Sequence, residues 1–335
     1  MKSLVAILGG LVLTAACGFN IDGPASTRLT REDSVMTSAP TNSPTAVTSL
    51  KEKAPPAGAN SGVPSAVLTP LGIPVEVLER SDAGYLVRTP CGSTAMVSAG
   101  VPIDRVQVVI DPGHGGKWDT GAVGPNGLIE RDLNLTLSRA VIRELSILGI
   151  PAAITRTGDY GMLLSVRAEF ADALGADALI SIHHNAPTWS SSSYPGTEVF
   201  VQSATAQQAH PDSARLGGLL YEEITAALAT FDNVSWSRLP DAGVLRVLLP
   251  SGEDTYGMLR RPNVPAALVE YGYLSNPSEA ELFATDEYIS VAAQATTEAI
   301  SAYLHSDRPG SGFILKPRSF NPHSASIPCD EPALE

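Results

Sequence analysis

The chain has 335 residues, and its 22 Lys and Arg residues against 35 Asp and Glu residues give a formal net charge of −13. Nucleic acids are bound mainly through clustered Lys and Arg that contact phosphates, so this balance argues against a nucleic-acid partner. Hydrophobic residues make up 44% of the chain, enough for a substantial core, whereas 3 cysteines are too few for a disulfide-dense scaffold. Because no apolar run reaches the roughly 18 residues needed to cross a bilayer, a polytopic membrane protein is excluded.

The first seventeen residues have the features of an export signal. Lys2 precedes an apolar run, and two alanines stand directly before Cys17. This ending resembles the lipobox of bacterial lipoproteins, in which the Cys becomes the lipidated first residue, although Thr14 stands where the lipobox usually has Leu. Ordinary signal cleavage nearby is the alternative. Both interpretations place the protein outside the cytoplasm, and the lipobox adds an anchor on the outer side of a membrane.

Residues 18–65 are predicted to be a disordered tether, because Pro, Ser, Thr and Ala dominate them and cannot bury enough apolar surface to offset the entropy of ordering. A β-rich segment, residues 66–103, follows. In it PVEVL and YLVRT flank the turn-forming S-D-A-G, which predicts a hairpin. The segment loosely resembles the small Src-homology-three-like modules of bacterial wall enzymes. A hairpin packed against the main domain is the alternative, since so short a segment seldom folds alone.

From about residue 104 to 306, apolar or β-branched runs alternate with helical patterns. The expected strands are VQVVI (106–110), AAIT (152–155), ALISI (178–182), TEVFV (197–201), VLRVL (244–248) and AALVE (266–270). Leucines and a valine repeat every four residues from Leu133 to Leu145, which predicts a helix, and further helices are expected near 164–174, 214–228 and 288–304. The alternation predicts an α/β domain with a mainly parallel mixed sheet of about six strands flanked by helices, whose ligands collect at the carboxyl ends of the strands. Residues 307–335 form a C-terminal tail.

Several polar residues stand where strands end or a helix begins. His114 lies in D-P-G-H-G-G after the first strand, and Glu130 begins the next helix. His183 and His184 follow ALISI, and because successive strand side chains point to opposite faces, one ring can be a ligand while the other supports it. Glu270 ends an apolar strand, where a buried carboxylate is costly without a partner.

Each of these residues has a structural alternative, such as a turn residue for His114 or a complement to the helix dipole for Glu130. Together they can converge at one edge of the sheet. Two imidazoles and a carboxylate with an open fourth position make a catalytic zinc site, and a second carboxylate can serve as general base.

These motifs resemble those of the zinc-dependent N-acetylmuramoyl-L-alanine amidases, which detach stem peptides from the glycan strands of bacterial peptidoglycan. The four family motifs are matched in order by VVIDPGHGG (108–116), ERDLNL (130–135), SIHHNA (181–186) and ALVEYGYLSN (267–276). ITRTGD (154–159) and Arg167 also fall in the family pattern. One departure is His184, where the family often has Ala.

The resemblance implies a zinc ion held by His114, Glu130 and His183. It also implies a catalytic Glu270 that transfers a proton during hydrolysis of the amide between N-acetylmuramic acid and L-alanine. The substrate is then peptidoglycan or a muropeptide, and His184 or Asn185 are suggested as further donors to the oxyanion. The alternative from another class is a zinc-retaining, non-catalytic wall-binding or regulatory protein, against which the presence of Glu270 speaks. A zinc peptidase of the H-E-x-x-H type is disfavoured because that motif is absent.

Cys91 and Cys329 remain as one candidate disulfide pair in an oxidising compartment. They would close a loop of roughly 240 residues, for which chain entropy suggests a stabilisation of roughly 4 to 5 kcal/mol, less any strain. The bridge would hold the C-terminal tail against the β-rich segment. Two unpaired thiols are the alternative.

Overall fold

The computed structural model describes residues 63–186, 196–203, 212–231, 243–312, 314, 316–320 and 327–335. The expected export signal and lipobox, and the expected tether up to residue 62, lie outside this set. Within it, no helix combines the length and the apolar character that crossing a membrane would need.

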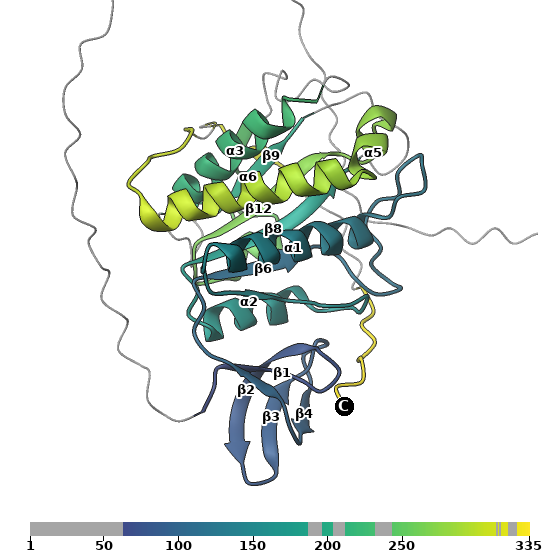
Figure 1. Cartoon of the computed structure of the whole chain (residues 1–335), viewed down its shortest axis with the longest axis vertical. Coiled ribbons are helices and arrows are strands. Elements are labelled where there is room, and N and C mark those ends of the chain that lie inside the picture. The colour runs from purple at the N-terminus through teal and green to yellow at the C-terminus, as the bar shows by residue number, and fades with distance from the viewer. Residues whose placement is uncertain are drawn as a thin grey trace, which may run out of the picture. The chain divides into compact units, whose positions relative to one another are not determined.

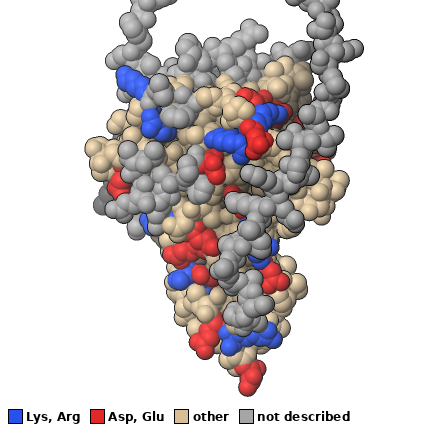
Figure 2. All heavy atoms as spheres, turned by 90° about the vertical axis from the view of Figure 1, so that its left-hand side faces the viewer, with Lys and Arg blue, Asp and Glu red and all other residues tan. Residues whose placement is uncertain are grey.

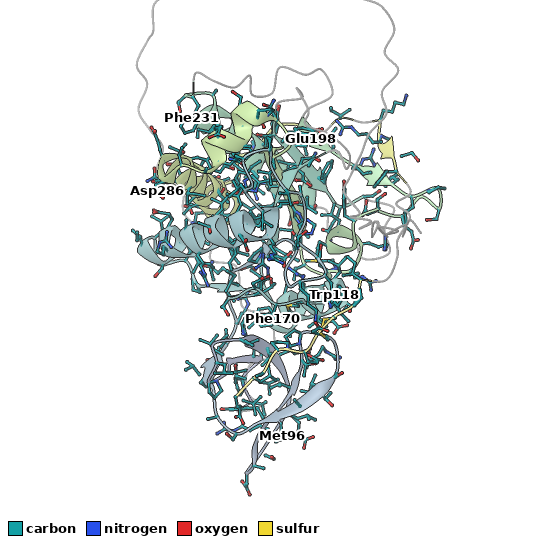
Figure 3. The ribbon with its side chains drawn as sticks, turned by 90° about the vertical axis from the view of Figure 1, so that its right-hand side faces the viewer. Met96, Trp118, Phe170, Glu198, Phe231 and Asp286 are labelled. Carbon is teal, nitrogen blue, oxygen red and sulfur yellow. A yellow bond between two sulfur atoms is a disulfide. The ribbon has the colours of Figure 1, made fainter. Side chains whose placement is uncertain are left out.

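The β-rich segment forms a five-stranded antiparallel sheet in the order β4-β3-β2-β1-β5 (Figure 1). Its strands are β1 (Ala66–Leu68), β2 (Pro74–Ser81), β3 (Gly84–Arg88), β4 (Thr94–Val97) and β5 (Val101–Ile103). The expected hairpin is the β2–β3 pair, in which Ser81 lies opposite Gly84. Buried valines form a small core of its own, while Met96 on β4 is exposed (Figure 3). The segment is therefore a complete small sheet, and its likeness to Src-homology-three modules stays a prediction.

The main sheet has six strands in the order β10-β9-β12-β8-β6-β7. They are β6 (Val108–Pro112), β7 (Ala152–Ile154), β8 (Ala178–Asn185), β9 (Glu198–Val201), β10 (Gly243–Leu245) and β12 (Ala266–Tyr273). Only the β9–β12 pair is antiparallel, so the sheet is mixed but mainly parallel, and the expected fold class is confirmed.

Helices cover both faces of this sheet, because alternate strand residues bury their side chains on opposite sides. Val108 and Ile110 pack with one group of helices, while Val109 packs with the other. The first group is α1 (Glu130–Ile147), α3 (Ser213–Leu228), α5 (Pro277–Phe283) and α6 (Asp286–His305). The second is α2 (Leu164–Ala173) and the short α4 (Gly257–Arg260). Figure 1 shows α1 and α6 on one side of the sheet and α2 on the other.

One expected strand is wrong as a single element. VLRVL (244–248) divides at Arg246, because β10 pairs with β9 while the next two residues form β11 (Val247–Leu248) and pair with β13 (Arg318–Ser319) of the tail. The chain therefore leaves the main sheet at this point to meet the tail. Helices α4 and α5 were not predicted, since 4 and 7 residues are too few for a clear apolar period.

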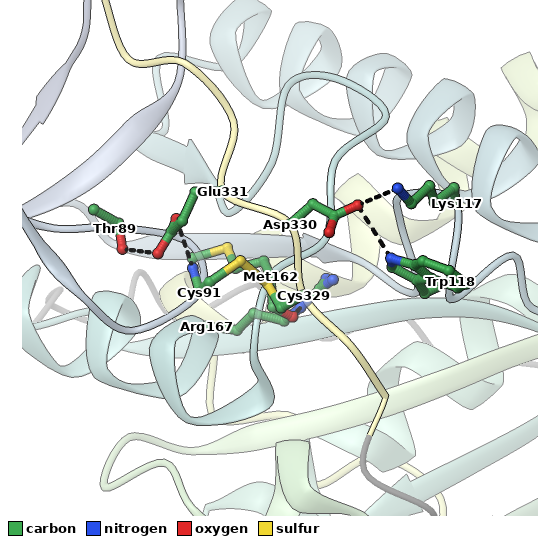
Figure 4. The surroundings of a disulfide bond; sticks show 9 residues. All are labelled: Thr89, Cys91, Lys117, Trp118, Met162, Arg167, Cys329, Asp330 and Glu331. Carbon is green, nitrogen blue, oxygen red and sulfur yellow. Dashed lines mark hydrogen bonds and ion pairs between the residues drawn. A yellow bond between two sulfur atoms is a disulfide. The ribbon is translucent and has the colours of Figure 1, made fainter.

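The C-terminal tail is fixed to the rest of the chain by the Cys91–Cys329 disulfide, which confirms the expected pairing (Figure 4). On the β-sheet side of the bridge, Glu331 accepts a hydrogen bond from the Thr89 hydroxyl at 2.5 Å. On the other side, Asp330 accepts one from the indole N–H of Trp118 at 3.1 Å. The tail thus joins the small sheet to the loop that follows His114.

Acidic and basic side chains are interspersed over the face drawn in Figure 2. Arg88 of β3 lies 2.9 Å from both Glu76 and Glu169. The described part of that face carries no continuous basic stripe.

Glu279 on α5 is a buried carboxyl group that gives the fold a pH dependence. It accepts a hydrogen bond from the Tyr273 backbone N–H, and burial raises its pKa from 4.5 to about 8. Between these values the folded chain keeps a proton that the unfolded chain has lost, so the free energy of unfolding falls as pH rises from about 4.5 to about 8. The Glu279→Gln variant should match the parent near pH 4.5 and exceed its stability by a few kcal/mol at pH 8.5. Urea denaturation of both proteins across this pH range tests the prediction. Free energies of unfolding that change with pH in parallel for the two proteins would contradict it.

Candidate active site

The structure brings the expected site residues together at one edge of the main sheet. His114 lies two residues after the end of β6, His183 lies near the end of β8, and Glu270 lies on β12. Since β6, β8 and β12 are neighbours and His183 is in register with Glu270, these side chains share one edge. Glu130 reaches the same place as the first residue of α1.

Three donor atoms point at one another in the way a metal site requires. Glu130 Oε1 lies 3.1 Å from His114 Nε2 and 3.1 Å from His183 Nδ1. All three donor atoms lie within 4.8 Å of one another. Ligand atoms that share a tetrahedral zinc ion lie roughly 3.3 Å apart, so the donor set fits such an ion in both chemistry and spacing.

Glu130 and His114 each shift the pKa of the other. Burial would raise the pKa of Glu130, but His114 and His183 outweigh it and hold that pKa well below its usual value. Burial would likewise lower the pKa of His114, and Glu130 and Asp119 reverse the effect and raise it well above its usual value. The neighbouring imidazoles thus keep the Glu130 carboxylate ionised, which is the form in which it can act as a ligand.

The turn that carries His114 has an unusual backbone. His114 has φ of 62°, the one positive φ at a non-glycine residue among the described residues. The preceding residue, Gly113, has no room for a side chain, because a Cβ there would lie 2.2 Å from the His183 ring. The glycine-rich motif therefore lets the two imidazoles approach each other.

Two buried arginines hold this turn from behind. The Arg167 guanidinium donates to the carbonyl oxygens of Pro112 and His114, each at 2.7 Å. Arg156 donates to the carbonyls of Pro112 at 3.0 Å and Gly113 at 2.9 Å. Arg156 and Arg167, which the sequence motifs contained without indicating a role, therefore fix the backbone of the turn at His114 and just before it.

Comparison with known proteins identifies the family of the chain. The family model described as N-acetylmuramoyl-L-alanine amidase (Amidase_3) matches residues 108–302. The chain belongs to this family. Its relatives include YqiI of Bacillus subtilis, 33% identical over 218 residues that are 65% of this chain and 92% of that protein. They also include the N-acetylmuramoyl-L-alanine amidase AmiA of Escherichia coli, 30% identical over 222 residues that are 59% of this chain and 76% of AmiA.

A solved structure shows the same fold. The N-acetylmuramoyl-L-alanine amidase from Clostridium difficile 630 superposes with a TM-score of 0.51 and 29% sequence identity. The match covers 60% of this chain and 98% of that one. The small sheet and the C-terminal tail of the present amidase lie outside the family match, which ends at residue 302.

Glu270 of the amidase is buried, being 4% exposed, and its Oε2 has no hydrogen-bond partner among the described residues. Burial first, and then the charges of Glu130 and Glu198, raise its pKa well above the usual value, which His114 partly opposes. A carboxyl group with a free oxygen atom and a raised pKa is suited to exchanging a proton.

Next to Glu270, sequence reasoning missed a second carboxylate, Glu198 on β9 (labelled in Figure 3). Glu198 accepts a hydrogen bond from Asn185 at 3.1 Å and pairs with Arg318 of the tail at 2.8 Å. The tail of the amidase thus places a positive charge beside the carboxylate next to Glu270.

The suggestion that His184 donates to an oxyanion is wrong. Its ring lies on the opposite side of β8 from His183, and its nitrogens bond to Asn134 and Tyr288. Burial lowers the pKa of His184 to about 3, so the ring is neutral. The amide nitrogen of Asn185 already donates to Glu198.

Sequence reasoning also missed Asp119, which accepts a hydrogen bond from His114 Nδ1 at 2.6 Å and thereby turns Nε2 toward Glu130. No sequence pattern in this glycine-rich loop predicts that role for Asp119. Asn134, which donates to Glu130 Oε1 at 3.3 Å, could have been found, because it lies four residues after Glu130 and thus on the same helix face.

The Arg167–Asp111 pair behind the turn predicts a large stability effect. Both side chains are at most 2% exposed and 2.9 Å apart. The Arg167→Met variant leaves the Asp111 carboxylate buried without its cation, so the free energy of unfolding should fall by about 3 to 5 kcal/mol. The exposed Arg105–Asp177 pair is the control, and Arg105→Met should cost less than about 1 kcal/mol. Urea denaturation of the three proteins measures the difference, and similar losses in both variants would contradict it.

Proposed function

We propose that the amidase uses one zinc ion, held by His114, Glu130 and His183, to hydrolyse the amide bond between N-acetylmuramic acid and L-alanine in peptidoglycan. The observation that carries the proposal is the convergence of these three donor atoms within 4.8 Å, beside a buried Glu270. The family match supports the reaction and the substrate.

Held by His114, Glu130 and His183, a zinc ion would supply a Lewis acid that could polarise the scissile carbonyl group and make an attacking water molecule more acidic. Glu270 accepts the proton of that water and later gives it to the departing nitrogen of L-alanine. One carboxyl group can do both, because the first step supplies the proton that the second step needs. The raised pKa of Glu270 gives its carboxylate a high affinity for the proton of the water, and a cation held by the neighbouring ligands would help to keep that carboxylate ionised before the first step.

The residues around these groups keep them in place. Asp119 orients the His114 ring, and Arg156 and Arg167 hold the turn on which that ring stands. Arg318 offsets the charge of Glu198, which would otherwise repel an ionised Glu270 more strongly. This set of contacts supports a rigid site in which the ligands are oriented before the metal binds.

The test of this function is a product analysis. Purified peptidoglycan is incubated with the zinc-loaded protein, and the fragments are identified by mass spectrometry. Peptides with free L-alanine amino termini beside intact glycan are expected. Fragments cut within the stem peptide would instead indicate a peptidase, and absence of any product would favour the non-catalytic wall-binding alternative.

We propose that the protein is exported and carries a lipid anchor on Cys17. After Cys17, the proposed order of parts is the tether of residues 18–65, the small sheet of residues 66–103, the catalytic domain of residues 104–306 and the tail of residues 307–335. The sequence before Cys17 supports the anchor. Cys17→Ser should move the protein from the membrane fraction to the soluble extracytoplasmic fraction. Fractionation followed by immunoblotting measures this, and unchanged membrane association would exclude lipid on Cys17.

A further inference from the structure

His184 takes part in a buried hydrogen-bond chain that ends at a proposed metal ligand. Tyr288 Oη lies 2.7 Å from His184 Nε2, and His184 Nδ1 lies 2.7 Å from Asn134 Oδ1. Asn134 Nδ2 then lies 3.3 Å from Glu130 Oε1. Tyr288, His184 and Asn134 are each 0% exposed. These hydrogen bonds join helix α6 to strand β8 and to helix α1.

The donor and acceptor of each of these hydrogen bonds follow from the groups that face Asn134 Nδ2. The Glu130 carboxylate and the Gly113 carbonyl can only accept, and both face Asn134 Nδ2, so that atom is the amide nitrogen. Asn134 Oδ1 must then accept from His184 Nδ1–H. Since the second ring nitrogen faces a hydroxyl group, it accepts from Tyr288 Oη–H, and the ring is in its neutral Nδ1–H form.

We propose that His184 is a positioning residue of the amidase, which fixes the Asn134 side chain so that its amide N–H groups stay on Glu130 and Gly113. Through these two contacts His184 acts on both sides of the metal site, the Glu130 carboxylate and the turn before His114. The proposal rests on the proposed function only in taking Glu130 to be a metal ligand. It gives a role to the residue at which this chain departs from the pattern often seen in the family.

The packing around the ring supports this role. Tyr271 stacks on His184 with centroids 5.5 Å apart and planes 21° apart, and Phe283 meets it edge-on at 4.9 Å. These contacts prevent the ring from turning over. Without His184, the Asn134 amide would lose the donor that holds its oxygen away from Glu130.

The first test needs no metal. Long-range proton–nitrogen NMR of the metal-free protein reports which nitrogen of each imidazole carries a proton, and the His184→Asn variant assigns the His184 signals by their loss. The proposal requires a proton on Nδ1 and none on Nε2. A ring with its proton on Nε2 and none on Nδ1 would donate no hydrogen bond to Asn134, and would overturn the proposal.

The second test compares two replacements by zinc affinity, measured in competition with a chelator. An Asn side chain can place its amide N–H where His Nδ1 stands, whereas Leu cannot donate. His184→Leu should therefore bind zinc 10- to 100-fold more weakly than the parent, and His184→Asn should stay within a few-fold of it. Both variants lose the ring and its bond to Tyr288, so the difference between them isolates the donor to Asn134.

The control is Tyr271→Phe, which removes a hydroxyl group from the same aromatic cluster. That hydroxyl bonds to Thr296 at 2.5 Å and not to His184, so zinc affinity should be unchanged. Equal affinities of the Leu and Asn variants would overturn the role of His184, while a parent protein that binds no zinc would overturn the metal site itself. If the Leu variant does not fold, the NMR experiment can still overturn the proposal.

Discussion

Replacing Glu270 by Gln is expected to lower turnover by a factor of about 10² to 10⁴ and to leave zinc stoichiometry unchanged. Gln keeps the shape of the side chain and can accept a hydrogen bond, but it cannot take up a proton from water. Because three other residues are the proposed ligands, the metal should remain. Glu270 is 4% exposed, so a neutral amide is tolerated there at least as well as a carboxylate.

Glu279→Gln is the matched control for this experiment, since it makes the same chemical change at another buried glutamate. Its turnover should stay within a few-fold of the parent. Zinc content, melting temperature and amide hydrolysis should be measured on the same preparations of all three proteins. Loss of zinc in Glu270→Gln would place Glu270 among the ligands, and near-normal hydrolysis would remove it from the mechanism.

The fold was predictable where local pattern and tertiary contacts agree. The leucine period of α1 and the apolar runs of β6, β8 and β12 correspond to elements whose burial follows the pattern. The direction of β9 was not readable, because an apolar run looks the same in either orientation. The separation of β10 from β11 depends on the tail strand β13, which contributes 2 residues and no periodic signal.

In the site, too, residues at the ends of elements were predictable, whereas contacts between residues far apart in the sequence were not. His114, Glu130, His183 and Glu270 stand at element ends that topology brings together, so their convergence was predictable. The residues that contact and orient the site were not predictable in this way. Arg318 meets Glu198 across 120 residues, and Tyr288 meets His184 across 104 residues, which no spacing rule reveals. Sequence therefore identified the groups proposed to act on the substrate, and the structure identified the groups that hold them.

Replacing His114 should abolish stoichiometric zinc binding and activity together, because it removes one of the three proposed protein ligands. The choice of replacement matters, since His114 has φ of 62°. Ala at this left-handed position carries a steric cost of roughly 1 to 2 kcal/mol, whereas Asn adopts the conformation more readily. Both His114→Ala and His114→Asn should therefore be made.

The two variants separate loss of a ligand from distortion of the turn. If the imidazole is a ligand, metal analysis should find far less than one zinc per chain in both variants, while the Asn variant keeps the melting temperature of the metal-free parent. His305→Ala, at an exposed position at the end of α6, should retain full zinc content and activity. Zinc loss in the Ala variant alone would show that the backbone of the turn, and not the ring, is what the metal needs. Because Arg156 and Arg167 hold that backbone independently of the ring, we expect both variants to lose the metal.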